Sequence, residues 1–475
     1  MIADLKPYTE YKDSGLPWLG QVPKHWASER AKWLFTKMDR PVREEDEVVT
    51  CFRDGTVTLR RNRRLRGFTE ATTFFGYQGI RKGDLVIHGM DAFAGAIGVS
   101  DSDGKGTPVY NVCQPGPGVN ASYYAYLVRQ MSQSQWILAL AKGIRERSTD
   151  FRFDMFGNQR VPLPPPAEQA AIVRFLDWAN ERLERAIRAK RKVIALLVEQ
   201  KQAIIHRAVT RGLDPNVPLK SSGIPWLGEI PVHWEVRRLR TLVNRIDQGV
   251  SPLAVGSLAD GESWGVLKSG CVNRGVFRET EHKRLARDFD IDPSIVVNVG
   301  DVLISRACGS PSLVGSVGRV RAMQYRLILS DKIFRAHFSD LVDTNFMVFA
   351  MNSPYYRQQV ESAISGAEGM ANNLPLSSLR DFCFAVPPSC VEAARIAEVV
   401  EAEIFDMQVA SSRLEREIDL LREYRTRLIA DVVTGKLDVR EVAARLPDET
   451  PLDAIEYDPD LTDDPDIADE EVVVA

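Results

Sequence analysis

Five arginines lie within seven residues of one another in the stretch 59–67, which reads LRRNRRLRG. They are Arg60, Arg61, Arg63, Arg64 and Arg66. On DNA, guanidinium groups neutralise phosphates and can donate paired hydrogen bonds to O6 and N7 of guanine. The same composition is compatible with a solvated basic loop. The residue types favour double-stranded DNA as a partner and make these arginines candidate contacts.

A second set of candidate DNA contacts is spread along the chain. The basic residues of its second half are Lys268, Arg274, Arg278, Lys283 and Arg284. Further candidates are His88, Met90, Lys105, Arg145, Ser305 and Arg306. Glycine-rich segments at 89–98 and 309–318 would let the backbone approach a groove closely. The pattern does not rank the candidates among themselves.

The sequence contains no recognisable catalytic motif. The stretch Asn352–Tyr355 (NSPY) lacks the second-position proline of an adenine methyltransferase loop, and no glycine-rich cofactor turn precedes it. No GxxxxGK[ST] motif for ATP is present. His25 and His233 each precede a tryptophan within a Pro/Gly-rich framework, which favours a packed structural role. We predict no catalytic residue, no metal site and no cofactor in this chain.

Composition suggests where the chain works. Its six cysteines contain no CxxC pair, so free thiols in a reducing cytosol are expected. No signal peptide and no apolar run of 18 residues is evident, so we expect a cytoplasmic protein without a membrane span. The net charge is −4, but residues 446–475 hold twelve carboxylates and no Lys or Arg. Without them the remainder carries +8, and we predict that this acidic tail is disordered.

Two long helical stretches must position the candidates. In 168–209 and again in 392–433, apolar side chains recur every three or four residues, and the two patterns superimpose at a spacing of 224. That period is typical of a coiled coil, because it keeps one stripe facing a partner helix. A helix of about 40 residues would be roughly 60 Å long. We interpret the pair as an antiparallel spacer rod; two ordinary core helices are the alternative.

The rest of the chain is a duplication. Residues 12–26 (KDSGLPWLGQVPKHW) recur as 220–234 (KSSGIPWLGEIPVHW), and 83–88 (GDLVIH) recurs as 300–305 (GDVLIS). Between these anchors, at 40–80 and 245–295, the halves diverge. Proline-rich breaks at 161–166 and 386–388 precede the long helices. Tandem similarity of this kind predicts two related structural units with constant frameworks and variable inserts.

Taken together, these motifs resemble the specificity (S) subunit of type I restriction–modification systems. The resemblance covers about residues 5–440 and rests on the SGxPWLGxxPxHW opening, the Gly-Asp strand, the PLPPPAEQxxI lead into a long helix and the duplication. Asn373 and Leu374, with Ser365 and Gly366, also resemble the SG…NL element of that family. The first unit and the second proline lead depart from the family pattern, which makes domain boundaries uncertain.

The resemblance implies an α+β fold. Two pseudo-two-fold-related mixed α/β target-recognition domains would be separated by a long antiparallel coiled coil of two conserved helical regions. The implied domains are recognition domain 1 (1–160), a central helical region (161–221), recognition domain 2 (222–388), a C-terminal helical region (389–440) and the acidic tail (441–475).

The implied function is non-catalytic. Each recognition domain would read one half of a bipartite, asymmetric DNA site, and the rod would set the spacing and dock two modification (M) subunits. S-adenosylmethionine, ATP and Mg would act on partner subunits, with restriction (R) subunits joining through the complex in phage defence. Two alternatives are a self-contained adenine-N6 methyltransferase with fused recognition domains and a coiled-coil scaffold without DNA contact.

Overall fold

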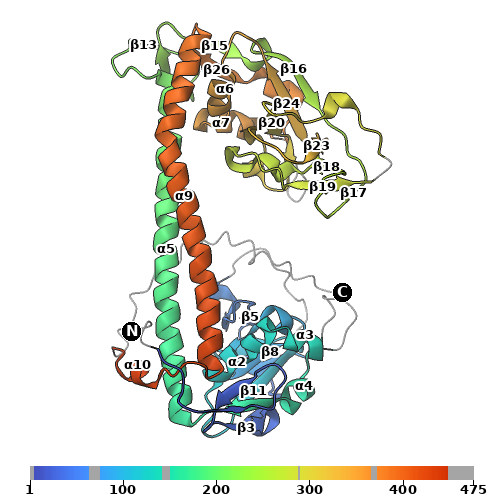
Figure 1. The fold of residues 1–475 in the computed structure, drawn as a ribbon, viewed down its shortest axis with the longest axis vertical. Coiled ribbons are helices and arrows are strands. Elements are labelled where there is room, and N and C mark those ends of the chain that lie inside the picture. The colour runs from blue at the N-terminus through green and yellow to red at the C-terminus, as the bar shows by residue number, and fades with distance from the viewer. Residues whose placement is uncertain (1–4, 64–74, 142–149, 287–288, 365–371, 448–475) are drawn as a thin grey trace. The chain divides into compact units, whose positions relative to one another are not determined.

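The computed structural model describes residues 5–63, 75–141, 150–286, 289–364 and 372–447 (Figure 1). The chain divides into two compact units. Unit 1 comprises residues 1–191 and 415–475, and unit 2 comprises residues 192–414. Each unit is described by itself. The five-part domain division predicted from the sequence stays a prediction, and the acidic residues from 448 onward lie outside the described part of the chain.

Unit 1 is built on an antiparallel four-stranded sheet of order β4-β11-β8-β9. Its strands are β4 (Phe35–Lys37), β11 (Tyr110–Pro115), β8 (Leu85–His88) and β9 (Ile97–Val99). Helix α2 (Ala121–Gln133) is capped by the Asn120 side chain, which accepts from two free N–H groups of its first turn. Its buried face, including Tyr124 and Leu127, joins one core with Leu85 and Ile97 of the sheet.

Short antiparallel ribbons surround this sheet. They are β1 (Tyr11–Asp13) with β2 (Gln21–Pro23), β3 (Ala27–Arg30) with β12 (Arg160–Leu163), β5 (Val49–Cys51) with β6 (Val57–Leu59), and β7 (Gln78–Ile80) with β10 (Gly104–Gly106). The other helical segments are α1 (Ala31–Leu34), η2 (Arg60–Asn62), η3 (Ala92–Ala94), α3 (Trp136–Leu140), α4 (Phe153–Asn158) and α10 (Arg440–Ala444).

Unit 2 repeats the framework of unit 1. Its sheet has the order β16-β24-β20-β22, formed by β16 (Val243–Gln248), β24 (Ile333–Phe338), β20 (Val302–Ser305) and β22 (Val317–Arg319). The ribbons β13 (Leu219–Ser221) with β14 (Glu229–Pro231) and β15 (Glu235–Arg238) with β26 (Cys383–Val386) correspond to β1-β2 and β3-β12. The duplication seen in the sequence is therefore a duplication of topology.

The inserts between the shared strands differ in structure. Unit 2 contains a second sheet with its own core, formed by β17 (Ala254–Val255), β19 (His282–Leu285), β18 (Trp264–Leu267) and β23 (Arg326–Ile328). Strands β18 and β23 pair in parallel. Unit 1 has the β5-β6 and β7-β10 ribbons in this part of the chain.

The remaining elements of unit 2 are short. They are η5 (Leu239–Thr241), η6 (Ser269–Gly275), η7 (Pro293–Ile295), β21 (Ala307–Cys308) with β25 (Asn372–Asn373), η8 (Pro311–Leu313), α6 (Thr344–Ala350), α7 (Pro354–Ala363) and α8 (Leu376–Asp381). Of the SG…NL element, Asn373 lies in β25 and Leu374 is buried, whereas Ser365 and Gly366 lie outside the described residues.

The two predicted rod stretches are confirmed as the long helices α5 (Pro166–Arg211) and α9 (Cys390–Val433). Within each unit the helices pack against each other in antiparallel fashion (Figure 1). In unit 1, Lys190 Nζ lies 2.6 Å from Glu417 Oε2, and Arg425 Nη1 lies 2.7 Å from Glu184 Oε2. These pairs explain why the polar residues Lys190 and Arg425 occur on the seam.

In unit 2 the two helices share an apolar core. Ile205 and Val209 of α5 lie in one core with Ile396 and Val400 of α9. The α+β fold with an antiparallel coiled-coil pair of helices is thereby confirmed in each unit. No described helix has the length and hydropathy needed to cross a membrane.

The N-terminal segment completes unit 1. Lys6 pairs with Asp438, which follows α9, and the Asp438 N–H donates to the Lys6 carbonyl at 2.8 Å. The Tyr11 hydroxyl donates to the Lys436 carbonyl at 2.9 Å. In unit 2 the corresponding junction, from α5 to β13, is continuous chain. Residues 5–7 (LKP) resemble residues 213–215 (LDP), which follow α5, and they pack at the equivalent place after α9.

Candidate nucleic-acid interface

The repeated His-Trp dipeptide holds the first turn of a long helix in each unit. In unit 1, Glu168 of α5 accepts from Trp26 Nε1 at 2.8 Å and from the Tyr8 hydroxyl at 2.5 Å, and His25 Nε2 lies 2.8 Å from its other oxygen. Burial and the adjacent carboxylate raise the pKa of Tyr8, so its hydroxyl stays a donor. A carboxylate at a helix N-terminus also complements the helix dipole.

Unit 2 repeats this contact with Glu392 of α9. Trp234 Nε1 donates to Glu392 Oε1 at 2.9 Å, and His233 Nε2 lies 3.0 Å from the same oxygen. Both tryptophan rings are fully buried. Each tryptophan also packs near the glycine that ends the other long helix, Trp26 beside Gly435 and Trp234 beside Gly212. The dipeptide therefore holds the sheet framework on the helix pair within its unit.

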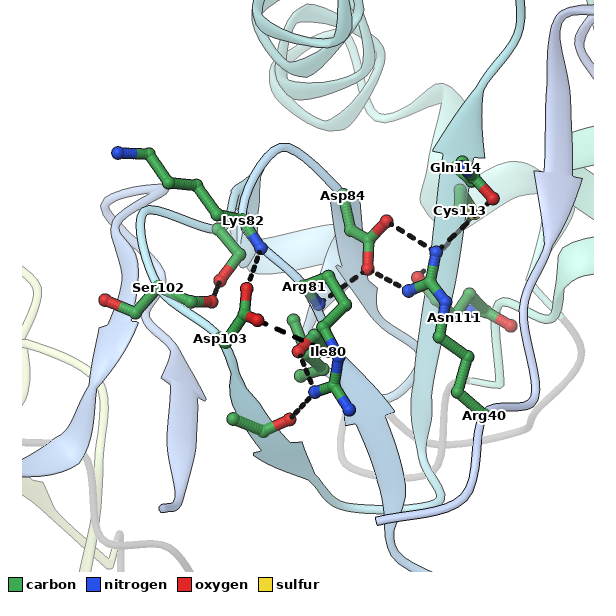
Figure 2. Close-up of polar contacts among 12 residues, drawn as sticks. Arg40, Ile80, Arg81, Lys82, Asp84, Ser102, Asp103, Asn111, Cys113 and Gln114 are labelled. Carbon is green, nitrogen blue, oxygen red and sulfur yellow. Dashed lines mark hydrogen bonds and ion pairs between the residues drawn. The ribbon is translucent and has the colours of Figure 1, made fainter. Parts of the chain in front are cut away.

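The repeated Gly-Asp turn is held by an arginine in both units. In unit 1, Asp84 accepts from the Arg81 N–H at 2.8 Å, and Arg40 donates to both of its oxygens (Figure 2). In unit 2, Asp301 accepts from the Asn298 N–H at 2.9 Å and from Arg335 Nη1 at 3.1 Å. These buried ion pairs fix the turn that begins β8 and β20.

A second arginine strengthens the turn in unit 1. Arg81 Nη1 donates to Asp46 at 3.0 Å and to the Gly104 carbonyl at 3.2 Å. The Lys82 N–H donates to Asp103 at 2.9 Å (Figure 2). The cations of this network are neutralised by carboxylates. It therefore stabilises the framework.

The ends of the shared strands β8 and β20 carry four of the candidates. His88 is half-buried beside the Tyr110 ring, at 5.0 Å between centroids, and Met90 is exposed. The Ser305 hydroxyl lies inside unit 2, fully buried. Arg306 donates to the Asp331 carbonyl at 3.0 Å and lies over the Phe334 ring at 5.7 Å. Met90 is thus the most exposed of the four.

The arginine-rich stretch of unit 1 follows strand β6. Arg60 and Arg61 lie in η2, where Arg61 Nη1 is 2.5 Å from Glu47 Oε1. Arg63 Nη1 is 2.6 Å from Asp54 Oδ2, and its guanidinium lies over the Phe52 ring. Burial opposes ionisation of Asp54, but the Thr56 N–H and Arg63 outweigh it and lower the pKa of Asp54.

Lys105 lies on β10, in the same unit as the arginine-rich stretch. Arg64, Arg66 and Arg145 lie outside the described residues. The carboxylates Glu47 and Asp54 were missed by the sequence reasoning. Glu47 faces Arg61 because Val49 pairs with Leu59 in the β5-β6 ribbon, a register that the residue types alone do not reveal.

The basic candidates of unit 2 lie on and beside η6 and β19. Lys268 Nζ is 3.6 Å from Glu281 Oε2, and Arg284 Nη1 is 3.8 Å from Asp260 Oδ2. Arg278 Nη1 donates to the Asn273 carbonyl at 3.2 Å. Arg274 and Lys283 are exposed. The structure thus brings together five candidates that lie up to 16 positions apart.

The NSPY stretch of unit 2 has a structural setting. The Asn352 side-chain amide donates to the Val317 and Val348 carbonyls at 2.9 and 2.8 Å, and Tyr355 is buried. Among the described residues, no group of three or more His, Cys, Asp and Glu side chains could hold a metal ion. The geometry at hand is that of two frameworks presenting basic and exposed residues on their variable parts.

Comparison with known proteins agrees with this layout. No family model matches the chain. A solved structure described as the basis of complex assembly and conformational transition of the type I R-M system has a TM-score of 0.55 at 14% identity. The alignment covers 87% of this chain and 98% of that one, so the two share a fold.

Two relatives that are similar in sequence are specificity subunits of type I restriction enzymes. The chain is 28% identical over 203 residues to the EcoEI specificity subunit of Escherichia coli, covering 42% of this chain and 34% of the relative. It is 24% identical over 306 residues to the MjaVIII specificity subunit of Methanocaldococcus jannaschii, covering 61% and 64%. The chain thus spans less than two thirds of these relatives. Its sequence is similar to those of type I restriction specificity subunits.

Proposed function

We propose that this chain is the DNA sequence-specificity subunit of a type I restriction–modification complex. Each unit would read one half of a bipartite, asymmetric site in double-stranded DNA, without catalysis by the chain itself. Methyl transfer with S-adenosylmethionine would fall to two M subunits, and ATP- and Mg-dependent cleavage to R subunits. The proposal also implies work in the cytoplasm, where the DNA and these partners are found.

One observation carries the proposal: identical frameworks hold unlike inserts. The sheet order, the His-Trp-Glu contact and the arginine-held Gly-Asp turn recur in both units, whereas the second sheet of unit 2 has no counterpart of the same order in the described part of unit 1. Contacts to base edges carry sequence information, so two copies of one framework cannot by themselves read different sequences. The inserts must therefore make the contacts that read the base sequence, and their dissimilarity predicts unlike half-sites.

The long helices support docking of two copies of one partner. Leu196 of α5 and Leu420 of α9 are 224 positions apart, so they occupy the same register of the two repeats, and they are 55% and 59% exposed. In unit 1, Leu420 and Tyr424 line a surface hollow of about 540 Å³, flanked by Lys190 and Glu417. Large exposed apolar side chains beside charges are typical of protein interfaces.

Sequencing of adenine methylation in the source genome, with and without the gene, tests the proposal. A bipartite motif with two unequal halves that vanishes on deletion is expected. A short continuous motif would instead favour a fused methyltransferase. Absence of any gene-dependent motif, together with no salt-dependent affinity for duplex DNA in the presence of M subunits, would favour a scaffold.

Inserting one heptad into each long helix tests the spacer role. Seven residues add about 10 Å at ~1.5 Å per residue, which corresponds to about 3 base pairs of B-DNA at ~3.4 Å each. The gap between the half-sites should widen by that amount while the half-sites stay the same. An unchanged gap in a folded, active complex would refute the spacer role.

A further inference from the structure

The loop η6 of unit 2 presents Arg274 in an unusual backbone conformation. Arg274 has a φ of 59°, and Gly275 follows at 77°. The left-handed region is strained for a residue with a β-carbon, and such residues persist where surrounding structure imposes them, often at functional sites. Gln135 of unit 1 is the other non-glycine residue with positive φ in the described part of the chain.

The loop is held in place by buried side chains and by hydrogen bonds from Arg278. Cys271 and Val272 are fully buried, and Val272 packs where Gly318 of β22 leaves room. The Arg278 N–H donates to the Cys271 carbonyl at 2.7 Å, and its guanidinium donates to the Asn273 carbonyl at 3.2 Å. Arg274 therefore projects from a rigid support.

Arg274 also differs in its partners from three of the basic residues near it. Lys268 and Arg284 face carboxylates, and Arg278 is bonded to the loop itself. The exposed guanidinium of Arg274 makes no hydrogen bond or ion pair with any residue that the structure describes. Its five donors are available to a ligand.

We propose that Arg274 reads a guanine in the half-site of unit 2, donating two parallel hydrogen bonds to O6 and N7 in the major groove. This inference rests on the proposed function and deepens it. A phosphate contact needs only a positive charge and tolerates a mobile side chain, whereas a bidentate base contact needs a planar fork held in a fixed direction. A strained, anchored loop bearing an unpaired arginine meets the second requirement. Gly270 and Gly275 have no side chains, so the backbone of this loop can approach DNA closely.

The test compares three substitutions in the full chain, assembled with its M subunits. Arg274→Lys keeps the charge and removes the fork. Arg274→Gly removes the side chain and suits the positive φ, so folding is protected. Lys283→Ala is the matched control, because it removes another exposed cation, on the neighbouring strand β19, that has no ion pair with any described residue. The wild-type motif is first established by methylation sequencing, and binding to that duplex and to unrelated duplex is then measured across salt concentrations.

For Arg274→Lys and Arg274→Gly, we expect specificity to relax at one G·C pair of one half-site, with roughly a 5- to 150-fold loss of discrimination there. Replacing that guanine with 7-deazaguanine should weaken wild-type binding similarly and leave Arg274→Gly unaffected. Lys283→Ala should weaken binding to all sequences alike and reduce the salt slope by about 1.

Two results would overturn the inference. One is a wild-type motif retained by Arg274→Gly, which has no side-chain donor for guanine. The other is an equal loss by Arg274→Gly on specific and unrelated duplex, which would mark a phosphate contact. If the wild-type complex itself shows neither motif nor DNA affinity, the proposed function fails before any substitution is made, so the two failures are distinguishable.

Discussion

Substituting Glu168 with alanine tests whether the His-Trp-Glu contact holds unit 1 together. The Glu168 side chain is 4% exposed and accepts from the Tyr8 hydroxyl and Trp26 Nε1, both of which are buried. A buried donor left without an acceptor costs about 1–3 kcal/mol, so losing two should cost about 4 kcal/mol. Hydrogen exchange in peptides of unit 1 would measure this loss, because it reports local unfolding in a chain with two units.

The repeat supplies a matched control, Glu392→Ala in unit 2. The Glu392 side chain is 34% exposed, so water can replace it, and we expect a loss of about 1 kcal/mol, confined to unit 2. Glu168→Gln should fall between the two, since it keeps an acceptor for Trp26 but loses the charge beside His25. Equal losses for the two alanine variants, or a loss below about 1 kcal/mol for Glu168→Ala, would refute the reasoning from burial.

Three further predictions concern single sites. Burial opposes ionisation of Asp247, but hydrogen bonds from Arg335 and a histidine outweigh it and lower its pKa below the ordinary 3.8. The stability that the ionised Asp247 contributes is present above pH 3.8 and is lost as pH falls through the folded-state pKa. The difference in urea midpoint between wild type and Asp247→Asn should therefore shrink below about pH 4. A difference that stays constant with pH would contradict this prediction. Gly435→Ala should lower the melting temperature more than Gly20→Ala, because both have positive φ but only at Gly435 would a β-carbon clash with neighbouring rings; equal shifts would show that the clash relaxes. Leu420→Glu should weaken M-subunit binding at least tenfold in calorimetry with an unchanged melting temperature, since a buried charge opposes an apolar interface; undiminished binding would move the docking surface elsewhere.

Repetition made the framework predictable. The apolar period of α5 and α9 predicts the two helices, because a 3.5-residue period depends only on residues close in the chain. The recurring His-Trp and Gly-Asp motifs marked the two units, and Glu168 and Glu392 share the 224-residue spacing of the helices. That spacing could have linked the glutamates to the dipeptides, had a partner 142 positions away been sought.

The variable parts were not predictable in the same way. The arginine that holds the Gly-Asp turn precedes it in unit 1, as Arg40, and follows it in unit 2, as Arg335, so no common pattern identifies it. The parallel pairing of β18 with β23 joins residues about 60 positions apart. The sequence shows the arginines of 60–66 as one cluster, whereas in the structure Arg61 and Arg63 face different carboxylates.

Helix periodicity and turn glycines can be predicted from the sequence because they arise from interactions between residues close in the chain. The duplication can be recognised because the same motifs occur twice. Which arginines are neutralised, and which one projects unpaired from a strained loop, was decided by strand register and burial. Those depend on contacts between distant segments, and they set the electrostatic surroundings of each cation. The sequence therefore identifies the candidate interface only as a set of residue types. The tertiary structure distinguishes Arg274 among them by its exposure and its lack of a carboxylate partner among the described residues.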